Sequence, residues 1–401
     1  MLESSNQSSL KSGKRGRNKK WRWLARSVAL LTWLAWAAFF KKVSTLATES
    51  CPQARNLSRN KDYDRLSVSF ATSIRGDEWN IERKRRIISH TLSSLQRLVD
   101  SARIFVFVDG PEMCQWFPPN YASVQCVDAS HCKNTKYNLA SVACLIRTFV
   151  SVASTEYVVF MNADIVIFNS FMDSLALVIS HYYDENFLMI GQRRRARRDI
   201  SRDERFEYLE CESLSWKLEG GYALDYFAFR RDDRIHHKMP PMLIGNWRWD
   251  SVLATMYYAE NVSVIDATET TPVWHQKPYE QWINHTSRPG SAYNSDIATK
   301  FMQEDLLFGS TNAASKFLHF SKDTTGIEIK ESTGAMLLDC AWREGSLWAL
   351  IRDYGIKDPN NLFTHIRHAP VQLMQRLNMN ISCTNKLRYL LQQPEMELSE
   401  Y

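Results

Sequence analysis

Short apolar runs alternate with longer amphipathic stretches through the first half of this chain. The runs are short and apolar enough to be buried strands, whereas the stretches between them carry apolar side chains at helical spacing. The predicted strands are 66–72, 104–108, the run ending at Asn162, and 187–191, and the predicted helices are 81–98, 139–152 and 171–183. Strands that alternate with helices predict an α/β fold with a doubly wound, mostly parallel sheet flanked by helices.

The start of the chain follows a different pattern, which predicts a membrane anchor. Residues 1–23 form a basic tail, and 24–42 contain an apolar run that ends at two lysines. The run is shorter than the roughly 20 residues of an average spanning helix, which suits a thin early-secretory membrane. The basic flank predicts a cytosolic tail and a lumenal body, hence a single-pass type II protein of the Golgi or endoplasmic reticulum membrane. A signal peptide cleaved after residues 35–37 is the alternative.

The residues beyond the apolar run have features of a secretory-pathway protein. The polar, aperiodic stretch 43–64 predicts a stem that holds the folded part off the membrane. All eight cysteines follow the apolar run without a CxxC pair, which permits disulfides and disfavours a zinc module. Cys114 is close enough in sequence to Cys126 and Cys132 to pair with either. Four Asn-x-Ser/Thr sequons also follow the run, at Asn56, Asn261, Asn284 and Asn380.

The net charge of +6 is concentrated in the basic tail. Residues 1–26 contain eight Lys and Arg residues against one acid, Glu3, so the rest of the chain is close to neutral. A basic surface for nucleic acid is therefore not expected. The apolar fraction of 44% is that of a folded protein with a sizeable core.

The first candidate for chemistry is Asp164, an acidic residue just beyond the apolar strand that ends at Asn162. Open α/β sheets bind their ligands at the carboxyl ends of the strands. A lone buried charge there is costly unless it is paired or binds a cation. The alternative is an aspartate that caps the next turn. Asp109 occupies the equivalent place at the end of strand 104–108.

Two further aspartates lie among aromatic residues. Asp225 begins the segment DYFAF and is expected in a half-buried strand or at a strand end. Asp250 follows Trp249 at the start of an apolar, helix-like run, 252–258. Trp249 offers a face on which a sugar can stack, and Asp250 offers a carboxylate for acceptor contact or general-base catalysis. The alternative for Asp250 is a helix N-cap.

His275 is a candidate second metal ligand, because imidazole is a common one. Lys277, two residues on, would lie on the same side of an extended segment and reach a diphosphate. The alternative for a lone histidine is an ordinary hydrogen-bonded residue. The run RRARR at 194–198, after Arg193, is expected to be a solvated basic loop, with an anion or partner contact as the alternative.

Five ordered segments resemble a group of GT-A-fold glycosyltransferases, which use nucleotide sugars. They are NADI at 162–165, GQR at 191–193, DYFAF at 225–229, MPPMLIGNWRWD at 239–250, and IDAT at 265–268 followed by HQ at 275–276. NADI resembles the DxD-type motif of this fold, with Asn162 in place of the first acid. HQKP resembles the metal-and-phosphate motif that ends other GT-A families. Residues 160–295 carry the resemblance, and 65–160 share only the strand pattern.

The resemblance implies a metal-dependent glycosyltransferase that moves a sugar from a nucleotide-diphosphate donor to a hydroxyl of a glycan, glycoprotein or polysaccharide. It implies a GT-A-like, Rossmann-like catalytic domain over 65–300 and a mainly helical extension over 301–401. The expected cofactor is Mn²⁺ or Mg²⁺. The implied roles are metal binding by Asp164 and His275, nucleotide-sugar binding by Asp109, Asn162, Arg193 and Lys277, acceptor binding by Trp249, and catalysis by Asp225 and Asp250.

Two other functions fit the same architecture. A GT-A-like lumenal protein that binds sugars or acts as a chaperone, without turnover, would be consistent with Asn162 at the place of an acid. A nucleotidyltransferase would normally need a basic, glycine-rich phosphate loop after the first strand. The sequence SIRG at 73–76 contains a single glycine, which disfavours that function.

Overall fold

The structure is a computed structural model of the 401-residue chain, which divides into two compact units, Met1–Arg55 and Asn56–Tyr401. It describes residues 66–75, 81–98, 103–117, 123–195, 206–214, 216–219, 223–260, 262–276, 288–302, 311, 314–320 and 326–331. The predicted tail, anchor and stem lie outside these residues, as do the four sequons, Lys277 and the predicted C-terminal helices. Within the described part of the chain, no helix combines the length and apolar character needed to cross a membrane.

An 11-stranded sheet forms the centre of the second unit. Its main path contains β1 (Val68–Ile74), β2 (Arg103–Val108), β3 (Val124–Asp128), β6 (Tyr157–Met161), β8 (Phe187–Arg195), β9 (Leu224–Arg230), β10 (Ser263–Asp266), β12 (Lys316–Phe320) and β13 (Ile327–Glu331), in the order β13-β12-β10-β8-β9-β6-β1-β2-β3. Along this path β9 is antiparallel to β6 and β8, and β13 is antiparallel to β12. The other neighbours are parallel, which confirms the predicted mostly parallel sheet.

Two very short strands lie beside the main path. β7 (Ile165–Val166) pairs only with β11 (Val273–His275), and β11 also runs parallel to the end of β8. A separate hairpin consists of β4 (Lys133–Asn134) and β5 (Leu139–Ala140). The described residues also contain three short 3-10 turns, η2 (Pro111–Trp116), η3 (Ser130–Cys132) and η4 (Ile235–Lys238).

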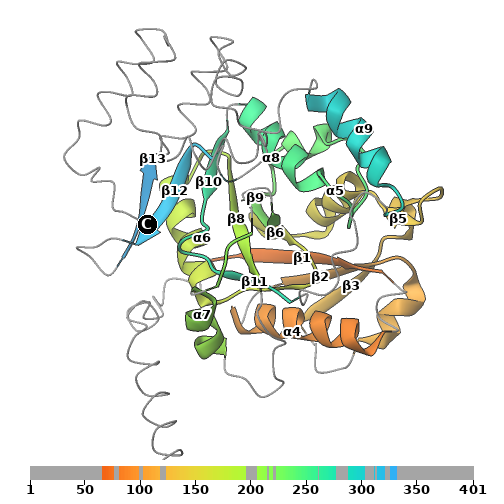
Figure 1. The fold of residues 1–401 in the computed structure, drawn as a ribbon, viewed down its shortest axis with the longest axis horizontal. Helices are drawn as coiled ribbons and strands as arrows, with labels where there is room; N and C mark the ends of the chain where they lie inside the picture. The colour runs from red at the N-terminus through yellow and green to blue at the C-terminus, as the bar shows by residue number, and fades with distance from the viewer. Residues whose placement is uncertain are drawn as a thin grey trace, which may run out of the picture. The chain divides into compact units, whose positions relative to one another are not determined.

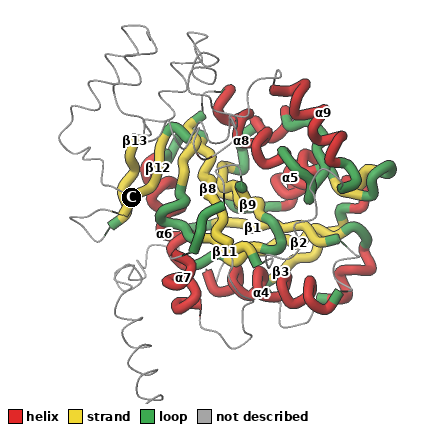
Figure 2. The backbone as a smooth tube through the Cα atoms, viewed as in Figure 1, coloured by secondary structure: helices red, strands yellow, loops and turns green. Residues whose placement is uncertain are grey.

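Helices cover both faces of the sheet (Figures 1 and 2). α4 (Glu82–Leu98) and α6 (Asn169–His181) pack on one face, and α5 (Val142–Val152), α8 (Trp249–Ala259) and α9 (Ser291–Met302) pack on the other. Strand β2 shows why both faces are apolar. Ile104, Val106 and Val108 enter the core beneath α4, whereas Phe105 and Phe107 enter the core beneath α5, as the alternation of side chains along a strand requires.

Most of the predicted elements are confirmed within a few residues, and three features differ from the prediction. β8 continues through Arg194 and Arg195, so these residues belong to a strand and the prediction of a solvated loop is wrong for them. Its pairing with β11 explains the extra length. A further helix, α7 (Phe206–Leu214), follows. β12 and β13 join the main sheet beyond residue 300, inside the predicted helical extension.

Disulfides fix the segments that follow β2 and β3 to neighbouring elements. Cys114 pairs with Cys126, which settles the alternative that the sequence left open, and Cys132 pairs with Cys144 on α5. Cys211 on α7 is also disulfide-bonded. Each of the first two bonds closes a short segment between neighbouring elements, because its cysteines are 12 residues apart in sequence.

Candidate active site

Most of the predicted site residues that the structure describes lie near one edge of the sheet. β1, β2, β6 and β8 run in the same direction, so their carboxyl ends meet at this edge. β9 runs the other way, and its first residues lie there too, with Met161 opposite Tyr226 and Asn162 bonded to Asp225. The topology therefore brings together segments that are widely separated in sequence, as expected for a ligand-binding edge of an α/β sheet.

Asp164 and His275 are brought together by the pairing of β7 with β11. His275 lies opposite Ile165, the residue after Asp164, and the Gln276 backbone N–H donates to the Asp164 carbonyl oxygen at 3.0 Å. The His275 Nε2 atom is 3.4 Å from Asp164 Oδ2. Both side chains are largely but not completely buried. A carboxylate oxygen and an imidazole nitrogen therefore meet at the rim of the sheet.

Helix α4 holds the backbone of this pair in place. The Gln276 amide donates to Thr91 Oγ1 and to the Ile87 carbonyl oxygen, both at 3.0 Å. The Thr91 hydroxyl donates to the Ala163 carbonyl oxygen at 2.9 Å. Residues on both sides of the Asp164–His275 pair are thus anchored to one helix, which limits the freedom of the two side chains.

A buried ion network lies next to this pair. The Arg193 guanidinium donates from Nη1 to both carboxylate oxygens of Asp225, at 3.1 and 3.2 Å, and from Nε to Glu219 at 2.5 Å. The Asn162 amide also donates to Asp225, at 2.6 Å. Burial alone would lower the pKa of Arg193, but Asp225 and Glu219 outweigh it and raise that pKa. Asp225 is therefore a buried anchor that pairs with the Arg193 guanidinium and accepts from the Asn162 amide.

Glu219 is a site residue that the sequence analysis missed. Its carboxylate accepts hydrogen bonds from Arg193 and Arg195. Burial opposes ionisation of Glu219, but the two guanidiniums outweigh that effect and lower the pKa of its carboxyl. Glu219 stands in a segment with no strand or helix signal of its own, and only its pairing with β8, through the bond from its N–H to the Arg193 carbonyl, brings it to the site.

Asp250 lies in the first turn of α8, and its carboxyl interacts electrostatically with Asp225 and Arg193. The pKa of the Asp250 carboxyl is raised to about 7, chiefly by burial and also by Asp225, whereas the Ser251 backbone N–H and Arg193 act in the opposite direction. The N-cap position belongs to Arg248, so the N-cap alternative for Asp250 is wrong. A carboxyl with such a pKa can exchange a proton near neutral pH.

Trp249 does not lie at the rim of the site. Its side chain is 3% exposed and packs edge-on against Phe160 and obliquely against Phe227 in the core beneath α8. Trp247 is 43% exposed instead, with the Arg248 guanidinium over its ring. Arg248 has a left-handed φ of 77°, which breaks the helical spacing and turns the two tryptophans to different environments.

Asp109 follows β2 on the same edge of the sheet, on the far side of β1 from Asn162. The Lys133 ammonium lies 3.5 Å from its carboxylate. The two residues line a cavity of about 10 Å³ together with Ser73, Ile74, Arg75, Val108, Ala129, Asn138, Ala140, Leu145 and Ile244. The cavity is close to the volume of a single water, so a nucleoside would have to lie over its mouth.

The donor atoms fit a divalent cation held jointly with a ligand. Among the described residues, the one group of three His, Cys or Asp/Glu side chains with converging donor atoms is His131, Cys132 and Cys144, and the disulfide between its cysteines rules it out as a metal site. Asp164 and His275 supply two donors. Two protein ligands leave room for phosphate oxygens and water, and a mixed oxygen–nitrogen set suits Mn²⁺ better than Mg²⁺.

Comparisons with known proteins find distant structural similarity alone. No protein-family model matches the chain, and no curated protein matches it. A crystal structure of S. aureus TarS 1–349 superposes with a TM-score of 0.36 at 11% identity, over 60% of this chain and 71% of that one. A TarS complex with UDP-GlcNAc gives a TM-score of 0.25 at 13% identity, over 34% of this chain and 37% of that one.

Two other solved structures have a comparably low structural similarity to this chain. GalNAc-T7 with UDP, GalNAc and Mn²⁺ gives a TM-score of 0.38 at 11% identity, over 59% of this chain and 48% of that one. A 4-diphosphocytidyl-2C-methyl-D-erythritol synthase from Anaerococcus prevotii gives 0.33 at 10% identity, over 58% of this chain and all of that one. Values this low give no ground for assigning an activity, so function has to be argued from the site.

Proposed function

We propose that this protein is a metal-assisted glycosyltransferase that moves a sugar from a nucleotide-diphosphate donor to a hydroxyl of a glycan, glycoprotein or polysaccharide. The observation that carries the proposal is the 3.4 Å approach of Asp164 to His275 at the carboxyl edge of the sheet. The two residues come from the two sequence segments that resemble GT-A metal-binding motifs. A chance turn cap would not need an imidazole from a separate strand beside it.

Asp164 and His275 would hold Mn²⁺ or Mg²⁺, which neutralises the charge that develops on a departing diphosphate. Asn162 and Asp109 would contact the nucleoside, one on each side of β1. Arg193, held in place by Glu219 and Asp225, would offer guanidinium N–H donors to the diphosphate, and Lys277 would add a cation.

The acceptor side of the proposal rests on Asp250. A transfer that inverts the anomeric centre needs a base opposite the leaving group, and a carboxyl with a pKa of about 7 can take the acceptor proton. In a retaining transfer Asp250 would orient the acceptor instead. Asp225 would act by holding Asn162 and Arg193. The exposed ring of Trp247 is a better stacking surface for a sugar than the buried ring of Trp249.

The proposed setting is the lumen of the Golgi or endoplasmic reticulum, with the chain anchored as a single-pass type II membrane protein. The apolar run at 24–42 and its basic flank motivate the anchor. The Cys114–Cys126 and Cys132–Cys144 disulfides support an oxidising compartment.

The test is turnover of nucleotide sugars with and without Mn²⁺. UDP-, GDP- and CMP-sugars are first screened by thermal shift, since a ligand that binds the folded state raises its melting temperature. Hydrolysis or transfer of the donor that binds is then compared between the wild type and Asp164→Ala. Metal-dependent turnover that Asp164→Ala loses would support the proposal. Equal rates in both proteins, insensitive to Mn²⁺, would contradict it and favour a protein without turnover.

A further inference from the structure

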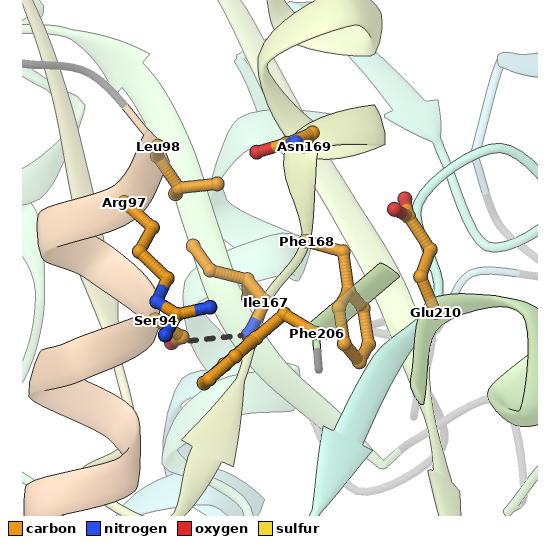
Figure 3. A pocket seen from close by; sticks show the side chains of 8 residues that line it. All are labelled: Ser94, Arg97, Leu98, Ile167, Phe168, Asn169, Phe206 and Glu210. Carbon is orange, nitrogen blue, oxygen red and sulfur yellow. Dashed lines mark hydrogen bonds between the residues drawn. The ribbon is translucent and has the colours of Figure 1, made fainter. Parts of the chain in front are cut away.

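A second cavity in the described part of the chain shares no residue with the candidate active site. Its volume is about 210 Å³, and it lies between the end of α4, the start of α6 and the start of α7. Its lining combines four polar side chains with four apolar ones. The polar ones are Ser94, Arg97, Asn169 and Glu210, and the apolar ones are Leu98, Ile167, Phe168 and Phe206. Figure 3 shows Arg97 and Glu210 on opposite sides of Ile167 and Phe168. No function assigned so far uses these residues.

The walls of the cavity are firmly built. Leu209 of α7 packs with Phe168, Trp216 and Trp274 in a separate apolar cluster. The buried Arg194 guanidinium donates from Nη1 to the Leu214 and Trp216 carbonyl oxygens, at 3.1 and 3.0 Å, and so holds the end of α7. Trp274 precedes His275 on β11, and side chains alternate along a strand. The apolar cluster that contains Trp274 therefore lies on the side of this small sheet that faces away from His275.

Polar groups on α6 and α7 fix the rim. The Ser170 backbone N–H donates to Glu210 Oε1 at 3.1 Å, which joins the first turn of α6 to α7. The Ser94 hydroxyl donates to the Thr91 carbonyl oxygen at 2.7 Å and accepts from the Ile167 backbone N–H at 3.5 Å (Figure 3). The rim residues are held by the fold and do not need a ligand to order them.

The chemistry of the lining selects a neutral ligand rich in hydroxyl groups. The Arg97 guanidinium lies over the Phe206 ring, 4.4 Å from its centroid, a contact that uses the face of the cation and leaves its N–H donors available. Glu210 brings acceptors, and the Asn169 amide brings a donor and an acceptor. An anion would meet the Glu210 carboxylate and a cation would meet Arg97, whereas hydroxyls can bond to both.

The volume of the cavity and its two phenylalanine rings further limit the class of ligand that it can bind. About 210 Å³ is below the range of roughly 300–1,000 Å³ for drug-sized ligands, which indicates an occupant of about one ring. Phe168 and Phe206 meet edge to face at 6.5 Å and present C–H and ring surface to the cavity. We propose that this cavity is a second carbohydrate subsite, which binds a single sugar residue through Arg97, Asn169, Phe206 and Glu210. It does not depend on the proposed transferase activity.

The test uses saturation-transfer NMR on the full chain with three probes at millimolar concentration, methyl α-mannopyranoside, methyl β-galactopyranoside and methyl N-acetyl-β-glucosaminide. We expect transfer to at least one glycoside, weakened about ten-fold or more by Phe206→Ala and by Asn169→Ala. Asn169 is exposed at the start of α6, so its replacement leaves the core intact. Tyr208→Ala is the matched control, because Tyr208 is an exposed aromatic residue of α7, the helix that carries Phe206, and does not line the cavity.

Two further arms make the outcome decisive. Asp164→Asn must leave the signal unchanged, since a signal lost in that variant would place the glycoside in the candidate active site and overturn the proposal. Inorganic phosphate, followed by the broadening of its phosphorus NMR line, serves as the anionic probe, and binding of phosphate without any glycoside would also overturn it. The proposal is equally wrong if no glycoside shows transfer, or if the signal survives both Phe206→Ala and Asn169→Ala in folded protein.

Discussion

Asp225 and Asp250 show how neighbouring carboxyl groups acquire different properties. Asp225 is 1% exposed, yet it accepts hydrogen bonds from Arg193 and Asn162, which compensate its charge. Asp250 accepts only a backbone N–H among the bonds that the structure gives it, so burial dominates and raises its pKa to about 7. One aspartate is thus suited to hold other groups, and the other to exchange a proton. Two titratable groups with divergent environments are typical of a catalytic site.

The raised pKa of Asp250 predicts a pH-dependent effect on stability. Because the folded pKa of about 7 lies above the ordinary value of 3.8, the contribution of Asp250 is fully present below pH 3.8 and is lost as the pH rises through 7. Asp250→Asn cannot ionise, so its free energy of unfolding should increase relative to wild type between pH 4 and 7. Urea unfolding at a series of pH values measures this difference. Asp296→Asn, at an exposed carboxyl on α9, is the control.

A difference between Asp250→Asn and wild type that stays constant from pH 4 to 8 would show that Asp250 titrates normally. The proposed role as a general base would then lose its physical support.

The lowered pKa of His236 predicts the opposite pH dependence of stability from that of Asp250. It is 1% exposed on η4, neither ring nitrogen has a hydrogen-bond partner, and burial together with His237 and Arg147 lowers the pKa to about 4. Its contribution to stability is therefore present above pH 6.5 and is lost as the pH falls toward 4, at no more than about 1.4 kcal/mol per pH unit. His236→Phe should unfold at a lower pH than wild type. His237→Phe, at the exposed neighbour, should not, and equal acid midpoints for all three proteins would refute the assignment.

At the scale of elements, pairing between distant segments decides what the sequence could predict. β1, β2 and β6 were predictable because both of their faces are apolar, which leaves a local signal. β9 is just as apolar, but nothing in its own residues says that it runs antiparallel between β6 and β8. β7 and β11 have two and three residues, too few for any periodicity. The sequence could therefore predict that a histidine would join Asp164, but it could not predict the strand pairing that brings the two residues together.

Helix α9 determines the position of the loop that leads into α8. The buried Asn294 amide accepts from the Leu243 N–H at 2.8 Å and donates to the Leu243 and Trp247 carbonyl oxygens, at 2.9 and 3.1 Å. Ser291 donates to Asn246 at 3.0 Å. These bonds join residues that the sequence shows no reason to connect. They hold the backbone just before Asp250.

We expect Asn294→Ala to lower the free energy of unfolding by about 2–4 kcal/mol, because it leaves buried backbone groups of Leu243 and Trp247 without their partner. Urea unfolding with an unchanged slope measures the loss. Ser295→Ala, the next position on the same helix, is the control and should change stability by less than about 0.5 kcal/mol. A loss no larger than that of the control would mean that water replaces the Asn294 amide.

At the scale of the whole molecule, the 11-stranded sheet is the centre of the described part of the chain. The acidic and basic groups of the candidate active site lie at the edge formed by the carboxyl ends of its parallel strands. Four carboxyl groups, Asp164, Glu219, Asp225 and Asp250, face two guanidiniums, Arg193 and Arg195, with His275 beside them. Glu219 and Asp225 already pair with the guanidiniums. The Asp164 carboxylate lies beside His275 at this edge, and Asp250 adds a negative charge when it is ionised, which favours a cation here. The central claim is that Asp164 and His275 bind this cation together.

The most direct measurement is pulsed electron paramagnetic resonance of Mn²⁺ added to the full chain with a nucleoside diphosphate. Coordination by His275 predicts a nitrogen modulation in the Mn²⁺ echo, since the imidazole nitrogen would be a direct ligand. His275→Ala should remove the modulation, Asp164→Asn should prevent Mn²⁺ from binding, and His181→Ala, at an exposed histidine on α6, should leave the signal unchanged. Bound Mn²⁺ without nitrogen modulation in the wild type, or with modulation that survives His275→Ala, would contradict the account.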